Sequence, residues 1–382
     1  MVINRVPDRN CYVGVDLQKD GCQISYLRTS APVSGGSPRT FSRVAGKEEY
    51  LLPMDPEEGP LCGEAFAVYL KKCFSLLSAD VPAEGICAVC FTARSMDAAL
   101  AGALRDAARA AVPGDVRILC EDHGQSFYSY MLVREEEQKK HGVMLLDGWG
   151  DDVRLRRMRI SRRTRPAVCM MGKEEVLMAG PFARDQEADA GLSQILSARL
   201  REEPASAVYL TGPLFAGGWM QDSLRTAARG RRAFRGDNLY STGAVYSALR
   251  DAGLIRNAGR YCCFGPDTLR SNIGILCRRK YAPVCLPLLE AGTEPDRAFA
   301  EEEFIMDDSG VLTLTQTDVT TGETQDTEVH LEPFPDRPEG TVRIRLTLSM
   351  PDSGTLHIAV QDLGFGEIFA SSGMRWEQVI RL

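Results

Sequence analysis

Two short segments share one pattern, and this repetition constrains the fold more than any other feature of the chain. Each is an apolar strand that ends in an aspartate, followed by a tight turn and a returning strand. The aspartates are Asp16 and Asp147, and the returning strands cover residues 22–28 and 153–160. Two such hairpins, far apart in one chain, predict two copies of one half-domain. That arrangement can hold a nucleotide phosphate tail and its magnesium between two carboxylates.

The composition is that of a globular protein of two or three domains, with 382 residues, 44% hydrophobic and 25% charged. The excess of 52 acidic over 45 basic residues argues against nucleic acid as the main partner. Residues 1–10 lack the apolar core of a signal peptide, and no run approaches the roughly 18 apolar residues of a membrane helix. We therefore expect a cytoplasmic protein without a membrane partner.

The 12 cysteines raise the question of a zinc site. Cys87 and Cys90 have CxxC spacing, but they lie in an apolar run, there is no second such pair, and the chain has only 4 histidines. We interpret the cysteines as small buried residues of a protein in a reducing compartment.

Helical and strand patterns alternate up to residue 265, which predicts an α/β domain with mixed sheets. From 266 onward, apolar and polar residues alternate with a period of two, as in half-buried strands, and we expect an all-β sandwich. The predicted domains are 1–265, with halves of about 1–140 and 141–265, and 266–382. Helices are expected over 61–78, 95–111, 125–137, 187–201, 219–229 and 242–252, and strands over 86–91, 116–120, 166–171, 207–211, 311–318, 328–331, 342–350 and 355–361.

Several motifs resemble those of the actin-like ATPase fold, a duplicated ribonuclease-H-like fold, and they follow one another along the chain as in that family. The whole chain resembles a divergent, shortened DnaK-type heat-shock chaperone. The β segment contributes a Pro-rich crossover at 331–335, a long strand, and an Asp-x-Gly-x-Leu turn at 352–356. The other motifs are the two hairpins, Gly63-Glu64-Ala65, Leu119-Cys120-Glu121, residues 208–212, and Asp237 through Gly243-Ala244.

The resemblance implies a set of functional residues and ligands. It implies ATP or ADP with Mg²⁺, and a polypeptide client that binds the β domain by strand addition, without a helical lid. Asp16 and Asp147 would hold the magnesium, and Glu121 would orient a water or the metal shell. The catalytic lysine would be Lys71 or Lys72. The nucleotide would be bound by the backbone at Gly14, Leu17, Gly148, Gly150, Gly212 and Gly243.

The hairpins also depart from the family pattern. Leu17-Gln18-Lys19-Asp20 follows Asp16 where the family has glycine and hydroxyl residues, and Trp149, Asp151 and Asp152 surround the single Gly150. Added carboxylates beside a polyphosphate are repulsive, by about 1 kcal/mol per pair at 4 Å in water and several times more near a protein surface. We therefore expect weak ATP hydrolysis or none.

These departures leave several alternatives open. Asp16 and Asp147 can be strand-end residues that satisfy turn N–H groups, and Glu121 can be a surface or capping acid. The protein as a whole can be a degenerate, non-hydrolysing interaction scaffold that keeps only the fold. An actin-like filament protein or a sugar-kinase relative is a third possibility, against which the β domain counts. Seven arginines between residues 154 and 165 predict a charged edge strand after the second hairpin.

Overall fold

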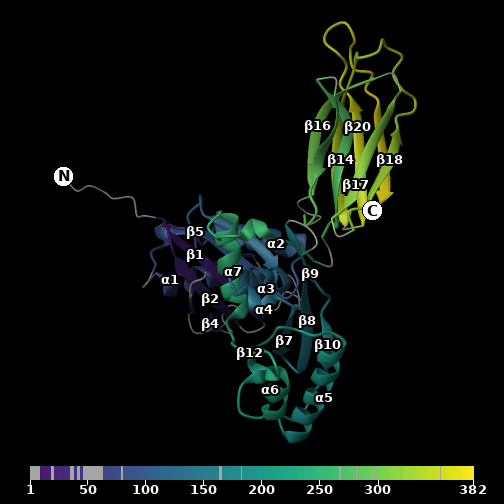
Figure 1. The fold of residues 1–382 in the computed structure, drawn as a ribbon. Helices are drawn as coiled ribbons and strands as arrows, with labels where there is room; N and C mark the ends of the chain where they lie inside the picture. Colours follow the sequence, from purple (N-terminus) through teal and green to yellow (C-terminus); the bar gives the residue numbers. More distant parts are fainter. Residues whose placement is uncertain are drawn as a thin grey trace, which may run out of the picture. The chain divides into compact units, whose positions relative to one another are not determined.

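The computed structural model divides the chain into two compact units (Figure 1). One unit comprises residues 1–160 and 169–261, and the other comprises 161–168 and 262–382. None of the described helices is long and apolar enough to cross a membrane. The structure describes residues 9–18, 21–34, 38–40, 44–45, 63–78, 81–162, 166–181, 183–265, 268–280, 282–293, 295, 298–307, 309–319, 321–352 and 354–382, without the side chains of 44, 45, 63–65 and 76.

The first hairpin belongs to a six-stranded sheet whose central order is β3-β2-β1-β5-β6, with β4 paired to β2. β1 is antiparallel to β2 and parallel to β5, and it is buried along its whole length, as expected for a strand covered on both faces. The strands are β1 Cys11–Gln18, β2 Gly21–Arg28, β3 Arg39–Thr40, β4 Val44–Ala45, β5 Ile86–Ala93 and β6 Arg117–Asp122, and the helices are α1 Gly63–Leu77, η2 Ala83–Gly85 and α2 Ala98–Arg109.

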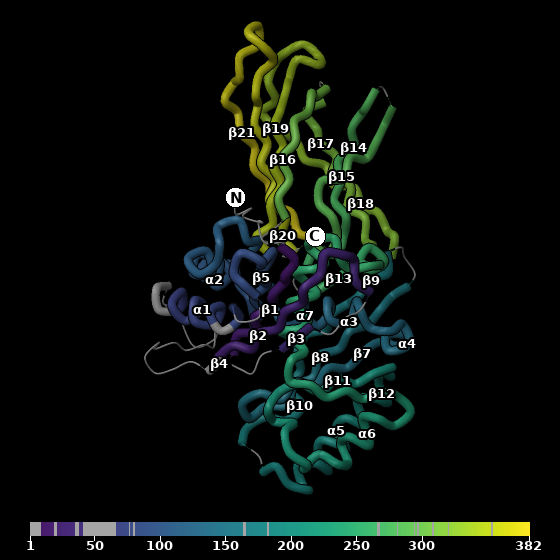
Figure 2. Tube along the Cα trace, turned by 90° about the vertical axis from the view of Figure 1, so that its left-hand side faces the viewer, coloured from purple at the N-terminus to yellow at the C-terminus, as the bar shows by residue number. Residues whose placement is uncertain are grey.

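The second hairpin belongs to a seven-stranded sheet of order β12-β11-β7-β8-β9-β13, with β10 paired to β8. α5 and α6 lie side by side, as Figure 2 shows, and their apolar residues share one cluster with β7 and β11. The strands are β7 Val143–Trp149, β8 Asp152–Ser161, β9 Ala167–Met171, β10 Glu175–Met178, β11 Ala207–Thr211, β12 Arg232–Arg235 and β13 Tyr261–Phe264, and the helices are α5 Gln186–Glu202, η3 Pro213–Phe215, α6 Gln221–Ala228 and η4 Ala258–Arg260.

The two sheets repeat one topology, an antiparallel hairpin followed by two parallel strands. Two further helices, α3 His123–Leu132 and α7 Leu239–Asp251, pack closely against each other. α7 follows β12 of the second sheet in sequence but packs on β1, β2 and β5 of the first, whereas α3 places Phe127 against Tyr209 of β11. This duplicated arrangement is the actin-like fold that the paired hairpins predict.

Some of the predicted elements differ in detail. The helix expected from Ser95 begins at Ala98, because the Asp97 side chain accepts the Leu100 amide and caps it. The helix expected over 125–137 is two helices, α3 and the short α4 Glu136–Lys139. The arginine-rich strand β8 is not an edge strand, because it lies between β7 and β9.

The second unit has two four-stranded antiparallel sheets, β15-β14-β17-β18 and β16-β19-β20-β21. Both sheets contribute to one apolar cluster. The all-β character predicted for this part is confirmed, and the assignment to a chaperone-type sandwich stays a prediction. The strands are β14 Ser271–Arg279, β15 Ala282–Leu289, β16 Phe299–Met306, β17 Val311–Asp318, β18 Thr324–His330, β19 Val342–Asp352, β20 Thr355–Asp362 and β21 Arg375–Arg381.

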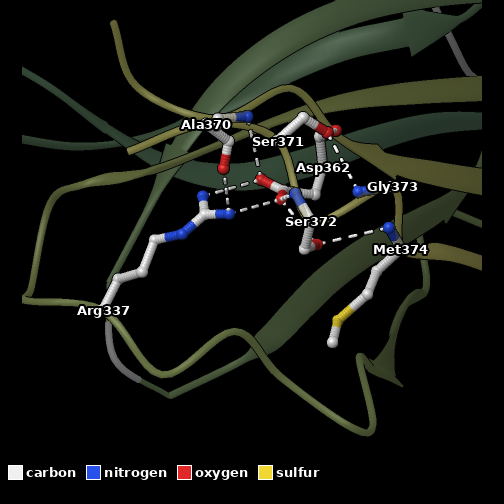
Figure 3. A network of polar contacts seen from close by, with 8 residues as sticks. Arg337, Asp362, Ala370, Ser371, Ser372, Gly373 and Met374 are labelled. Carbon is white, nitrogen blue, oxygen red and sulfur yellow. Dashed lines mark hydrogen bonds and ion pairs between the residues drawn. The ribbon is translucent and has the colours of Figure 1, made fainter. Parts of the chain in front are cut away.

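A buried ion pair closes the loop between β20 and β21 (Figure 3). Asp362, whose side chain is fully buried, accepts hydrogen bonds from Arg337 Nη1 at 3.0 Å and Nη2 at 2.7 Å. The Gly364 and Ser372 amides donate to the same carboxylate, at 3.0 and 2.6 Å. Burial raises the pKa of the Asp362 carboxyl, but Arg337 and the amides outweigh it and hold the pKa below its usual range.

Candidate functional site

The two hairpin aspartates lie at equivalent places, each two residues before the end of its strand rather than at the end as the sequence predicts, and both are buried. Asp16 of β1 stands opposite Thr92 of β5, and Asp147 of β7 stands opposite Thr211 of β11. Asp16 is 1% exposed and Asp147 is 7% exposed, so neither carboxylate faces open solvent. The duplicated topology places them in the two hairpins as the sequence predicts, but a buried carboxylate needs partners, and the chain itself supplies them.

A histidine and a tyrosine provide these partners. His123 Nε2, at the start of α3, lies 2.8 Å from Asp16 Oδ1, and Gln18 donates to the other oxygen of Asp16 at 2.7 Å. The Tyr240 hydroxyl, on α7, donates to Asp147 Oδ2 at 2.6 Å. The two rings stack, with centroids 3.6 Å apart and planes 10° apart. Asp16, His123, Tyr240 and Asp147 therefore form one continuous chain of contacts, which we call the aspartate bridge.

Burial alters the acid–base properties of this bridge. It raises the pKa of Asp147 to about 6, although His123 and the Tyr240 hydrogen bond oppose the rise. It also raises the pKa of Tyr240 well above its ordinary value, and the adjacent Asp147 adds to this. Tyr240 therefore stays a hydroxyl donor at neutral pH, as its bond to Asp147 requires.

Glu121 is buried as well, so it is not a surface acid, and its neighbour Asp122 rather than Glu121 caps α3. It is the second-last residue of β6, and Ser126 of α3 donates to its Oε1 at 2.6 Å. The Ser247 hydroxyl of α7 donates to its Oε2. Burial raises the pKa of Glu121 to about 7, against the opposing effects of Arg250 and the two serines. The carboxyl thus joins two helices that belong to different halves.

This raised pKa predicts a pH dependence of stability that is specific to Glu121. The folded protein keeps the proton up to about pH 7, whereas the ordinary value is 4.5, so unfolding releases a proton between these values. The free energy of unfolding should therefore fall as the pH rises through this window. Over this window the free energy of unfolding of the parent should fall by about 3 kcal/mol more than that of Glu121→Gln, since one pKa unit corresponds to about 1.4 kcal/mol.

Urea unfolding of both proteins between pH 4.5 and pH 7.5 measures this difference. The same substitution at the exposed Glu137 of α4 serves as the control, because that side chain has no burial to lose. Parallel pH profiles for the parent and Glu121→Gln would show that Glu121 ionises normally in the folded protein.

The glycines predicted to approach a nucleotide instead approach other parts of the chain. A Cβ on Gly14 would lie 2.1 Å from the Ser241 carbonyl oxygen, and one on Gly243 would lie 2.1 Å from that of Ser126. A Cβ on Gly212, at φ +103°, would lie 2.3 Å from the carbonyl oxygen of Gly148. These close approaches explain the glycines without a ligand.

The remaining predicted residues lie apart from the aspartate bridge or have structural surroundings. Leu17 is 4% exposed and belongs to the apolar cluster of the first sheet. Gly150 occupies the hairpin turn at φ +60°, and a Cβ added to it would have no atom within 4 Å. Gly148 packs against Leu214 and Phe215. Lys71 is exposed and Lys72 partly exposed on α1.

Sequence reasoning did not select His123 or Tyr240. Each lies at the start of a helix that was expected to begin two or three residues later, at 125 and 242, so neither was assigned to the hairpins. One signal was available, because His123 is one of only 4 histidines and lies two residues after Glu121.

A magnesium–nucleotide complex does not fit the residues present. Its two proposed carboxylates already have protein partners, and the Gly14 backbone contacts α7. His123 Nδ1 and Asp147 Oδ1 are buried without a hydrogen-bond partner among the described residues. No group of three His, Cys, Asp or Glu within the described part of the chain is placed to hold a metal ion.

Comparisons with known proteins give two family models and a distant likeness in structure. A model described as "Family of unknown function (DUF5716) C-terminal" matches residues 62–265, and "Domain of unknown function (DUF8552)" matches 268–382. No curated protein matches the chain. A ROK hexokinase from Thermus thermophilus is similar at TM-score 0.39 and 13% identity, covering 63% of this chain and 99% of that one.

An inorganic polyphosphate/ATP-glucomannokinase from Arthrobacter sp. strain KM is similar at TM-score 0.38 and 13% identity, again over 63% of this chain and 99% of that one. Likenesses at this level do not bring an activity to the chain. The fold assignment therefore rests on the repeated strand order and the two crossing helices described above.

Proposed function

The chain belongs to the family of unknown function DUF5716, and we propose that this member is a non-hydrolysing interaction scaffold built on an actin-like fold. The observation that carries the proposal is the aspartate bridge. Phosphoryl transfer depends on positioned phosphates and charge neutralisation by metal and cationic groups. Here the two carboxylates that would serve that chemistry hold His123 and Tyr240 instead.

A second set of contacts supports the same proposal. Arg94, which follows β5 in the first half, lies 3.2 Å from Glu174, which precedes β10 in the second half. Arg154 lies 3.1 Å from the same carboxylate and Arg156 lies 3.8 Å from it. An enzyme that admits and releases a nucleotide must let its two halves separate. This cluster and the aspartate bridge oppose that separation.

Calorimetry with ATP and Mg²⁺, paired with thermal unfolding, tests the proposal. We expect no heat of binding and no rise in Tm at millimolar nucleotide, because the site would have to lose a buried histidine–aspartate contact and a ring stack to admit phosphates. A magnesium-dependent rise in Tm that is lost in Asp147→Ala would overturn the proposal and make Asp147 a metal ligand. A rise that survives Asp147→Ala would place the nucleotide elsewhere.

The alternative from the sequence is a chaperone-like protein that binds ATP between the hairpins and an extended polypeptide on the β domain. The structure gives this alternative no specific support, and it stays a prediction that the same calorimetry tests. A cytoplasmic location is part of our proposal for either function, since the cysteines of the described segments are free thiols, as in a reducing compartment. We further propose that the partners are proteins.

A further inference from the structure

The four edge strands of the second unit are protected to different degrees. An exposed edge strand offers unpaired N–H and C=O groups to another chain, and proteins block such edges with proline or with charges that point inward. β15 carries Pro283 and Pro287. β16 places Glu302 in phase with Phe304, on the side of the strand that faces the apolar cluster. β18 carries acids but no Lys or Arg, so two copies of it would repel each other.

β21 has none of these protections. Its sequence contains no proline, and the side chains in phase with the apolar cluster are Trp376, Gln378 and Ile380. Among the described residues it pairs with β20 alone. Its outward face includes Val379, which is 58% exposed. A seven-residue strand of this kind is a site where another strand can add to the sheet.

The hydrogen bonds at both ends of β21 identify the backbone groups that are free. The Asp362 amide donates to the Met374 carbonyl at 3.0 Å, and the Leu382 amide donates to the Gly354 carbonyl at 2.9 Å. Since the direction alternates along a strand without a bulge, the even-numbered residues bond β20. Residues 375, 377, 379 and 381 therefore direct their N–H and C=O groups to the open edge.

We propose that this edge pairs with the same edge of a second copy of the chain. An antiparallel pairing centred on Val379 sets Val379 of one copy opposite Val379 of the other. It also sets Glu377 of each copy opposite Arg381 of the other, which gives two attractive pairs. These residues are the ones with free backbone groups, so the pairing also forms regular ladder bonds. Centring on Gln378 instead would set Arg375 against Arg381, which is repulsive. Centring on Trp376 would set Arg375 opposite Glu377, but it would pair only residues 375–377 of the strand. The charges and the length of the paired segment together favour the register centred on Val379, in which the two sheets become one continuous sheet with two-fold symmetry.

The inner face of the strand supports the same register. It sets Trp376 of one copy opposite Leu382 of the other, and both side chains are only partly buried in the single chain, where they pack at the margin of the apolar cluster. Pairing would cover this margin. This inference does not depend on the proposed loss of nucleotide binding, because it concerns only the second unit.

Sedimentation equilibrium of the full chain over a range of concentrations tests the proposal. We expect a monomer–dimer equilibrium whose Kd rises roughly tenfold or more in Glu377→Arg, because two attractive pairs become repulsive. The double variant Glu377→Arg/Arg381→Glu should restore the dimer. Lys280→Glu is the control, because it reverses the charge of an exposed side chain in the turn between β14 and β15, on the other sheet, and it should leave the Kd nearly unchanged.

A backbone variant tests the ladder itself. Val379→Pro removes an amide that does not bond β20, so the sheet should remain folded, with unchanged circular dichroism, while the dimer is lost. A parent that is monomeric at every concentration would overturn the proposal. So would a dimer that the double variant fails to restore, because the charge pairing would then be wrong. If Val379→Pro fails to fold, the charge variants still decide.

Discussion

Replacing Gly243 by alanine should lower the free energy of unfolding of the first unit by about 3 kcal/mol or more. The new Cβ would lie 2.1 Å from the Ser126 carbonyl oxygen and 2.7 Å from the Ser126 carbonyl carbon, so α3 and α7 would have to move apart. Overpacking in a core typically costs about 1–3 kcal/mol, and here both contacting groups are helix backbone, which cannot turn away. Urea unfolding followed by circular dichroism measures the loss.

Gly191→Ala provides the matched control, since Gly191 lies inside α5 and no atom lies within 4 Å of an added Cβ. There the same substitution should stabilise the protein by about 0.5–1 kcal/mol, because alanine is the better helix former. Equal and small effects at the two positions would show that the helices do not cross at Gly243.

Replacing Asp362 by alanine should destabilise the second unit by about 3–5 kcal/mol. The substitution leaves the largely buried Arg337 guanidinium without its carboxylate, and removing one partner of a buried pair is strongly destabilising. It also removes the acceptor of the Gly364 and Ser372 amides, so the loop between β20 and β21 loses its closure. Thermal unfolding of the full chain with Trp149→Phe and Trp219→Phe in the background, followed by the Trp376 fluorescence, reports on this unit.

The double variant Arg337→Met/Asp362→Leu separates loss of a contact from burial of an uncompensated charge. It should recover much of the stability, because no charge is then left buried. A double variant as unstable as Asp362→Ala would show that the backbone amides, rather than Arg337, carry the contribution.

The same carboxylate should make the second unit sensitive to acid. Its pKa is lower in the folded protein than in the unfolded chain, so its contribution is complete above about pH 4 and is lost as the pH falls through the folded value. This direction is opposite to that of Glu121, whose raised pKa makes the first unit less stable as the pH rises toward 7.

The secondary structure could be predicted where a local signal was strong. The period-two alternation of 342–350 and 355–361 gave β19 and β20, and the hairpins were found from their apolar runs and turns. Helix starts were less accurate, because Asp97 and Asp122 cap α2 and α3 through their own side chains and the sequence offers several similar residues nearby. The arginine-rich β8 was misplaced at an edge because strand order depends on pairing with distant segments.

The candidate site could be predicted only in part, and for the same reason. Asp16 and Asp147 each follow an apolar run, and that local pattern is visible in the chain. Their partners are not local: His123 is 107 residues from Asp16, and Tyr240 is 93 residues from Asp147. No spacing rule connects residues at such separations, so the aspartate bridge is visible only once α3 and α7 are placed against the sheets.

The sequence by itself determined the repeated strand–aspartate–hairpin units, and with them the duplicated α/β fold, because apolar periodicity and turn residues act over a few neighbouring positions. It also determined the change to an all-β segment after residue 265. Only the tertiary structure decided what surrounds the carboxylates, since burial and hydrogen bonding depend on segments far apart in the chain. The two aspartates that suggest a nucleotide site in the sequence are, in the folded protein, bonded to the protein's own histidine and tyrosine.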